Sequence, residues 1–140
     1  MRVGRYLITG VLGHGGMGEV YAAQDTELSR AVALKFVRAE LFEAGTGAER
    51  CVREAKAASA LNHPNIVTIY EVIHAEAAVA IAMELVEGTN LRKLCGSRPP
   101  VDQVMYLAQQ IASALAAANL HGIVHRDIKP ETSWCGVTGT

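Results

Sequence analysis

The stretch GHGGMGEV, residues 13–20, follows a segment with the composition of a β-strand, residues 6–12, and runs into a second such segment, residues 19–24. Its glycines allow the tight turn that an antiparallel pair of strands requires. We therefore predict a β-hairpin whose turn is unusually rich in glycine.

The same stretch fits the pattern GxGxxGxV, with glycines at Gly13, Gly15 and Gly18 and a valine at Val20. Phosphate oxygens need backbone N–H donors at close range, and Cβ atoms obstruct that approach. The pattern alone is a weak signal, because a flexible hairpin explains it equally well. A Walker A loop would end in Gly-Lys-Ser/Thr, and a dinucleotide-binding fold would continue into a helix. The segment after Gly18 predicts a strand instead.

The rest of the chain continues this pattern of strands and then changes to helices. The helix expected at 48–61 ends before Pro64, because the residue before a proline avoids helical angles. Gly88 ends the last strand, and Gly122 suits the C-terminal cap of the last helix. The further strands are expected at 31–37, 66–73 and 79–86, and the further helices at 90–95 and 101–121. We predict an α+β fold: a five-stranded antiparallel sheet with one helix, followed by the first helices of a helical domain.

The composition argues against several classes of protein. The chain has 140 residues, half of them hydrophobic, and a formal net charge of −1, which argues against disorder and against nucleic-acid binding. No stretch reaches the roughly 20 apolar residues that span a bilayer, and the apolar run at the N-terminus is too short for a signal peptide. Three scattered cysteines without a CxxC pair favour reduced thiols in the cytoplasm over a zinc site.

A charged side chain interrupts the apolar strand at Val32-Ala33-Leu34-Lys35. A lone lysine of this kind is most simply an edge residue with its ammonium group in water. The alternative is a lysine that faces a cleft and holds phosphates, which needs a carboxylate to orient it. Glu54 on the following helix can supply that carboxylate, although Arg53 and Lys56 beside it also fit a solvated helix face.

A second charged segment, HRDIKPE, occupies residues 125–131. Taken singly, its charges fit an exposed loop. Asp127 can also accept the proton of a substrate hydroxyl, and Lys129 can neutralise charge that builds up on a phosphoryl group in transfer. The two interpretations stay open on these residues alone.

Together these motifs make the chain similar to the bacterial-type Ser/Thr protein kinases. The matching segments are GHGGMGEV, VALK, Glu54 in REAKAASALNHPNIV, MELVEG and HRDIKPE, from about Tyr6 to Glu131. The resemblance implies a nucleotide-binding N-lobe at residues 6–87. It also implies the start of a helical C-lobe, with the catalytic loop, at residues 88–131.

The resemblance implies that the intact family binds ATP and Mg²⁺ and transfers the γ-phosphate to Ser or Thr hydroxyls of proteins. It further implies that His125 is a structural support and that Arg126 holds an activation loop. The catalytic residues it implies are Asp127, Lys129, Lys35 and Glu54. The nucleotide-binding residues it implies are Gly13, Gly15, Gly18, Val20, Ala33, Lys35, the gatekeeper Met83, and the hinge residues Glu84 and Val86.

The sequence departs from the family at Thr132, where the family has an Asn that binds magnesium. The Asp-Phe-Gly segment, whose aspartate also binds magnesium, is absent too, so we assign no metal ligand in this chain. A Thr hydroxyl is a poor substitute for an Asn carbonyl in an octahedral oxygen shell. We therefore expect weak activity or none.

The tail TSWCGVTGT, residues 132–140, does not resemble the family. With one permitted set of codons, a single restored A turns its reading frame into Asn-Val-Leu-Val-Arg-Arg-Asp-Gly-His, which begins with the missing Asn. Our hypothesis is a frameshift after Glu131, from a one-base deletion or a sequencing error, and the encoding DNA decides it. A genuine short protein with a divergent tail is the alternative.

We thus interpret the chain as the ATP-binding fragment of a Ser/Thr protein kinase that acts on protein substrates. The alternative is a non-catalytic, pseudokinase-like module that binds a partner. The helix at 101–121 carries an apolar stripe, so we expect association or aggregation through its exposed face.

Overall fold

The computed structural model describes residues 1–15, 18–37, 48–75, 78–124 and 134–136. The chain divides into two compact units, each described by itself below. The first unit comprises residues 1–62 and 67–85, and the second comprises residues 63–66 and 86–140.

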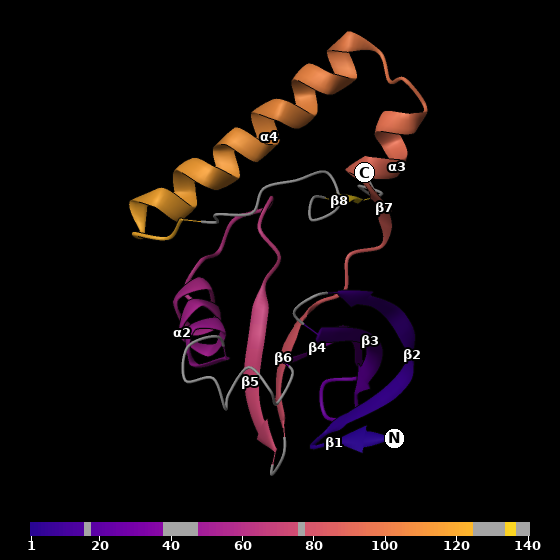
Figure 1. Cartoon of the computed structure of the whole chain (residues 1–140), viewed down its shortest axis with the longest axis vertical. Coiled ribbons are helices and arrows are strands. Elements are labelled where there is room, and N and C mark those ends of the chain that lie inside the picture. The colour runs from indigo at the N-terminus through magenta and orange to yellow at the C-terminus, as the bar shows by residue number, and fades with distance from the viewer. Residues whose placement is uncertain (16–17, 38–47, 76–77, 125–133, 137–140) are drawn as a thin grey trace. The chain divides into compact units, whose positions relative to one another are not determined.

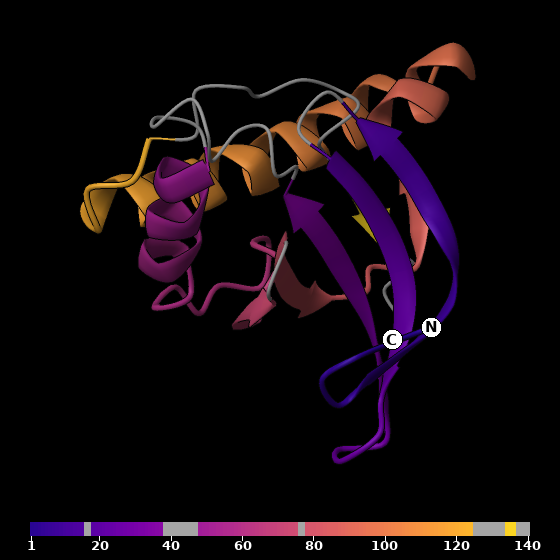
Figure 2. The same ribbon diagram turned by 60° about the horizontal axis from the view of Figure 1, so that its bottom comes forward.

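The first unit is built on an antiparallel sheet of six strands in the order β1-β2-β3-β4-β6-β5. All five predicted strands are present, which confirms the predicted fold class. A short additional strand, β1, pairs with the edge of β2; it consists of only two residues, too few to form a recognisable pattern. The strands curve strongly, as Figures 1 and 2 show. Their bounds are β1 Arg2–Val3, β2 Tyr6–Gly15, β3 Gly18–Asp25, β4 Arg30–Val37, β5 Ile69–Ala75 and β6 Ala78–Glu84.

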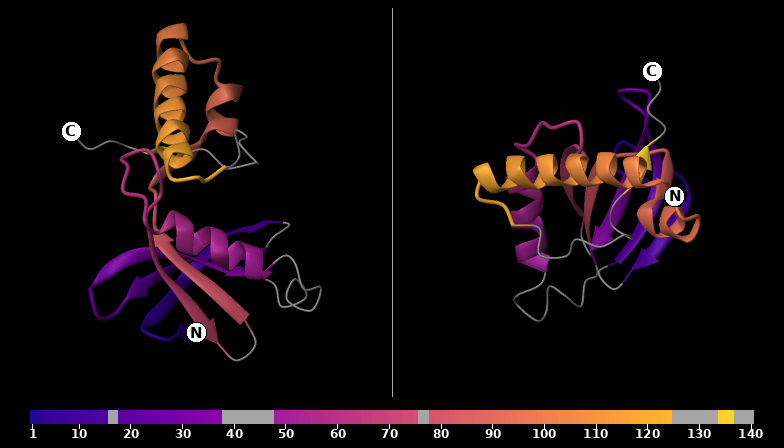
Figure 3. Two further views of the ribbon diagram at one scale, coloured as in Figure 1. Left: turned by 90° about the vertical axis from the view of Figure 1, so that its left-hand side faces the viewer. Right: turned by 90° about the horizontal axis from the view of Figure 1, so that it is seen from above.

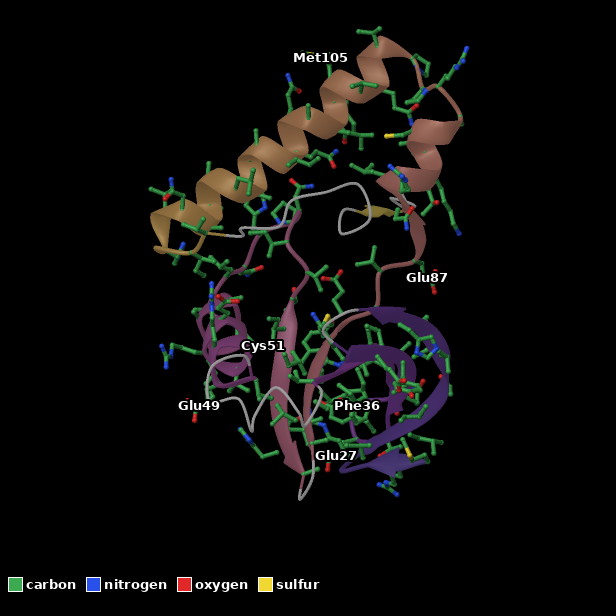
Figure 4. The ribbon with its side chains drawn as sticks, viewed as in Figure 1. Glu27, Phe36, Glu49, Cys51, Glu87 and Met105 are labelled. Carbon is green, nitrogen blue, oxygen red and sulfur yellow. The ribbon has the colours of Figure 1, made fainter. Side chains whose placement is uncertain are left out.

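Each face of this sheet carries its own apolar cluster, because successive side chains of a strand point to opposite faces. Face 1 carries a cluster of five buried residues: Tyr6, Ala23, Val32, Leu34 and Ala82. Face 2 carries Val37 and Ile81, which pack against Ala55 of helix α2 (Ala48–Ala58). Cys51, labelled on α2 in Figure 4, packs against the same cluster, and Figure 3 shows α2 lying against the sheet.

Helix α2 ends three residues earlier than predicted. Its last turn tightens, with the N–H of Ala60 donating to the carbonyl of Ala57 at 3.4 Å and that of Leu61 to Ala58 at 3.0 Å. Leu61 is nevertheless buried, so the apolar periodicity that predicted a helix to residue 61 continues one turn past the regular helix.

Asp25 fastens the turn between β3 and β4. Its carboxylate is fully buried and accepts the backbone N–H groups of Glu27 and Leu28, both at 3.1 Å. The second carboxylate oxygen lies 3.3 Å from Nε of Arg5 and 3.8 Å from Nε of Arg30. Burial disfavours the charged form, but these donors and cations outweigh it, so the pKa of Asp25 lies below its ordinary value.

Arg5 connects this polar cluster to β5, the last strand in the order of the sheet. Its guanidinium lies 3.3 Å from the carboxylate of Glu71 on β5, and the hydroxyl of Tyr6 donates to the same carboxylate at 2.8 Å. The guanidinium of Arg30 stacks on the ring of Tyr70 at 3.6 Å from the centroid. Side chains of β2, β3, β4 and β5 are therefore joined by polar contacts as well as by apolar packing.

The second unit contains β7 (Gly88–Asn90), α3 (Leu91–Gly96), α4 (Val101–Leu120) and β8 (Trp134–Gly136). The side chain of Asn90 caps α3 by accepting the N–H of Lys93 at 3.1 Å. Gly122, with φ +72°, follows the end of α4 and donates to Asn119, which confirms the predicted glycine cap. β7 pairs antiparallel with β8, and we predicted neither of these short strands from the sequence.

The segment 63–66 belongs with α4 because two hydrogen bonds join them. Nε2 of His63 lies 3.1 Å from the hydroxyl of Ser113, and the side-chain amide of Asn65 donates to Gln110 at 3.2 Å. Along the described parts of the chain, no helix is both long and apolar enough to cross a membrane.

Replacing Asp25 with Asn should lower the melting temperature of the protein by several degrees at neutral pH. The amide retains the shape and the acceptor for the turn but loses the charge that faces Arg5 and Arg30. Because the pKa of Asp25 is lowered on folding, its charge stabilises the fold above about pH 4 and ceases to do so as the pH falls through the lower folded pKa. Thermal unfolding followed by circular dichroism from pH 3 to 7 should show the difference from wild type narrowing in acid.

Glu27→Gln in the same turn is the matched control, because its side chain is 67% exposed, and it should change the melting temperature little. A deficit of Asp25→Asn that is equally large at pH 3 and pH 7 would contradict the electrostatic account.

Candidate functional site

The strand register aligns the glycine-rich turn with the lysine of β4. Across β2, β3, β4 and β6, one row of paired residues runs from Gly13 through Val20 and Lys35 to Ile81. Directly opposed residues in antiparallel strands share one face of the sheet. Ile81 belongs to the cluster packed against α2, so the whole row lies on face 2.

The neighbouring row extends this set toward the end of β6. Ala22 pairs with Ala33, and Ala33 pairs with Met83, which also packs against the face 2 cluster. Gly13, Val20, Ala33, Lys35 and Met83, which were predicted from motifs far apart in the sequence, therefore lie on the same face of one sheet.

Gly18 is required by packing. Its φ is +145°, and a Cβ atom at this position would lie 1.8 Å from the carbonyl oxygen of Phe36 on β4. Only glycine allows β3 to begin so close to the backbone of β4. Gly15 pairs with Gly18 across the turn.

Gly13 is different, because no atom of the described residues lies within 4 Å of a Cβ atom built on it. The fold therefore has no steric need for glycine at Gly13. A bare backbone facing open space beside the Lys35 row is what close approach of a ligand's oxygen atoms would require.

Lys35 and Glu54 do not form an ion pair in the described part of the structure. The carboxylate of Glu54 instead contacts Nε of Arg50, one turn earlier on α2, at 3.0 Å. The Glu54 side chain is 59% exposed, whereas Lys35 is half-buried. The sequence does carry a signal for the Arg50 contact, because opposite charges four residues apart on one helix lie side by side. The predicted pairing of Glu54 with Lys35 overlooked that local partner.

The predicted hinge residues fall in different environments. The N–H of Glu84 donates to the carbonyl of Thr68 at 2.8 Å, and its carboxylate accepts the N–H of Thr68 at 3.1 Å. Glu84 pairs with Val32, so its side chain lies on face 1, away from Lys35. Val86 is half-buried and belongs to the second unit.

The remaining predicted site residues lie outside the described residues. They are His125, Arg126, Asp127, Lys129 and Thr132. Among the described residues, no group of three or more His, Cys, Asp or Glu side chains is placed to hold a metal ion.

This arrangement of a glycine-rich hairpin, a half-buried lysine and one helix packed on a curved antiparallel sheet matches the N-lobe of a protein kinase fold. Residues 6–132 match the family described as the protein kinase domain. The chain belongs to the protein kinase domain family.

Its relatives include bacterial serine/threonine-protein kinases. The chain is 43% identical over 129 residues to PrkC of Bacillus subtilis and 38% identical over 130 residues to PknD of Mycobacterium tuberculosis. Each alignment covers 91% of this chain but only 20% of the relative, so the chain spans a small part of the length of these kinases.

The fold matches a solved structure of the same kind. The crystal structure of the Mycobacterium tuberculosis PknI kinase domain superimposes with a TM-score of 0.86 at 27% identity, covering 98% of this chain and 57% of the other. Sequence and structure thus agree on the family.

Gly18→Ala should destabilise the fold by about 3 kcal/mol, since the new methyl group meets the Phe36 backbone and the positive φ is strained. Gly13→Ala should change stability by less than about 0.5 kcal/mol, because its methyl group meets no atom in the part of the chain that the structure describes. Urea unfolding of the two variants beside wild type measures both effects. Equal stability losses in the two variants would contradict the packing difference.

Proposed function

We propose that this chain is the ATP-binding part of a Ser/Thr protein kinase catalytic domain. We propose that residues 6–87 form its nucleotide-binding lobe and that residues 88–131 begin the second lobe. The observation that carries the proposal is the common face shared by the open backbone at Gly13 and the half-buried Lys35. Family membership and the bacterial serine/threonine-protein kinases among its relatives support the same conclusion.

In this proposal, different residues of face 2 bind different parts of the nucleotide. Val20 and Ala33 cover the adenine, and Met83 borders it at the end of the same row of strands. Backbone groups of Glu84 and Val86 bind the adenine edge; the N–H of Glu84 is already bonded to Thr68, so its carbonyl is the group left for this role. Gly13 and Gly15 allow the turn to approach the phosphates, and Lys35 binds them through its ammonium group.

Glu54 orients Lys35 in this proposal, and that role requires its carboxylate to leave Arg50. The pair of Arg50 and Glu54 is exposed and separated by one helical turn, so it contributes only about 0.3–0.5 kcal/mol. A contact of this strength is easily exchanged for one with Lys35 when phosphates are bound nearby.

The chemical step rests on the segment 125–132. Asp127 accepts the proton of a protein Ser or Thr hydroxyl as its oxygen attacks the γ-phosphorus, the bond from that phosphorus to the bridging oxygen of the β-phosphate breaks, and ADP leaves. Lys129 stabilises the charge on the phosphoryl group during the transfer. Magnesium supplies charge neutralisation on the phosphates in the family, but Thr132 stands where its Asn ligand is expected. We therefore propose weak turnover or none. An ATP substrate, together with the free thiols of Cys51 and Cys95, fits a cytoplasmic location.

Lys35→Ala should weaken ATP binding by about 10- to 100-fold, the range expected for losing hydrogen bonds to a charged group. Affinity for adenosine should change little, because adenosine has no phosphate. Titration by isothermal calorimetry measures both ligands. Lys56→Ala, on the exposed side of α2, is the control and should bind ATP as the wild type does. Undiminished ATP affinity in a folded Lys35→Ala protein would refute the proposed site.

A second candidate function, that of a non-catalytic module that binds a partner, is supported by the surface of α4. This helix exposes an apolar face in which Val101 is 78% and Met105 56% exposed; Met105 is labelled in Figure 4. An apolar face of this kind favours association.

Turnover tests the proposed loss of activity, and association tests the second candidate. With labelled ATP and a general Ser/Thr protein substrate at several magnesium concentrations, we expect nucleotide binding with little or no phosphate transfer. Turnover of about 1–100 per second, typical of active kinases, would contradict the proposed loss at Thr132 and exclude the non-catalytic module. Sedimentation of wild type beside Met105→Lys tests association, which the charge should reduce.

A further inference from the structure

Three polar side chains of the glycine-rich hairpin lie together on face 1 of the sheet. His14 on β2 pairs directly with Glu19 on β3, and Nδ1 of His14 lies 3.3 Å from Oε1 of Glu19. The hydroxyl of Tyr21 donates to the other carboxylate oxygen of Glu19. One carboxylate thus receives a contact from each strand of the hairpin.

These side chains lie on the face opposite the candidate nucleotide site. Gly13 pairs with Val20 and belongs to the Lys35 row on face 2, so His14 and Glu19, the next pair toward the turn, lie on face 1. They are therefore placed to hold the hairpin without touching a ligand on face 2.

Tyr21 connects this pair to the apolar cluster of face 1. Its ring packs edge to face on Phe36 at 5.5 Å between centroids, and Phe36 packs in turn against the face 1 cluster. The carbonyl oxygen of Phe36 is also the atom that Gly18 approaches. Phe36 thus supports the hairpin in two ways, through its backbone at the turn and through its ring beneath Tyr21.

The protonation of Tyr21 suits this role. The hydrogen bond to Glu19, with burial and the carboxylate charge adding to it, raises the pKa of Tyr21 above its ordinary value. The hydroxyl therefore keeps its proton, and remains a donor to Glu19, throughout the neutral range.

We propose that His14, Glu19 and Tyr21 form a clasp that holds the glycine-rich hairpin in position over the phosphates of the nucleotide. The three are positioning residues, because they act on the ligand only through the backbone of the hairpin. This role in ATP binding rests on the proposed function, whereas the clasp itself is a property of the hairpin alone.

Tyr21→Phe removes only the hydroxyl and keeps the ring on Phe36. Hydrogen–deuterium exchange of the hairpin amides, residues 10–22, should become about two- to fivefold faster without nucleotide, because loss of the hydroxyl that orients the Glu19 carboxylate weakens its cross-strand contact with His14. Exchange in α4 should stay unchanged. The matched control is Tyr106→Phe, which removes the hydroxyl of a tyrosine exposed on α4.

The second measurement compares ATP with AMP for Tyr21→Phe, Glu19→Gln and the double variant. Affinity for ATP should fall about two- to fivefold while affinity for AMP stays the same. The double variant should lose less than the product of the two single effects, because both act through one contact.

The outcomes separate the clasp from the proposed function. Unchanged exchange in the hairpin of Tyr21→Phe would overturn the clasp, whatever the nucleotide results. Faster exchange with equal losses for ATP and AMP would overturn its role at the phosphates. If wild type binds neither nucleotide, the proposed function fails, and the exchange result still decides whether the clasp exists.

Discussion

Gly18 packs onto the carbonyl oxygen of Phe36, at the point where the glycine-rich hairpin meets β4. This contact sets where β3 begins relative to β4. It therefore sets the register of the pair, that is, which residues of β3 and β4 lie opposite each other. A slip of one residue would move Val20 away from Lys35 and turn every side chain of β3 to the other face. The alignment of the glycines with the lysine thus depends on one position where no Cβ atom fits.

Two kinds of packing hold the aligned strands. Face 1 is closed by Leu34, Val32 and their neighbours, and face 2 is covered in part by α2 through Ala55. Lys35 lies on face 2 between Ala33 and Val37, both buried. A half-buried ammonium group needs water or an anion as its partner, and a phosphate is the partner that we propose for Lys35.

Much of this architecture was predictable from the sequence, because its strands and helices carry strong local signals. Pro64 ended the helix prediction near the correct residue, and Gly122 marked the end of α4. The strand β1 was missed because two residues are too few to show the alternating hydrophobic pattern of a strand. The strand β8 was missed because its pairing with β7 joins segments far apart in the chain. The alignment of the site rows depends on strand register, which the motifs imply only through the family resemblance.

Charge contacts were the least predictable part. Glu54 had two potential cationic partners, and the local one on α2 is the contact that forms. A helical neighbour four residues away is always within reach, whereas Lys35 belongs to another element, so the local contact costs less side-chain entropy. The same reasoning explains why Glu19 contacts His14 and Tyr21, which the hairpin itself brings beside it. In this fold the backbone register brings Gly13, Val20 and Lys35 onto one face of the sheet, whereas the charge contacts of Glu19 and Glu54 form with residues that are close in the same hairpin or helix.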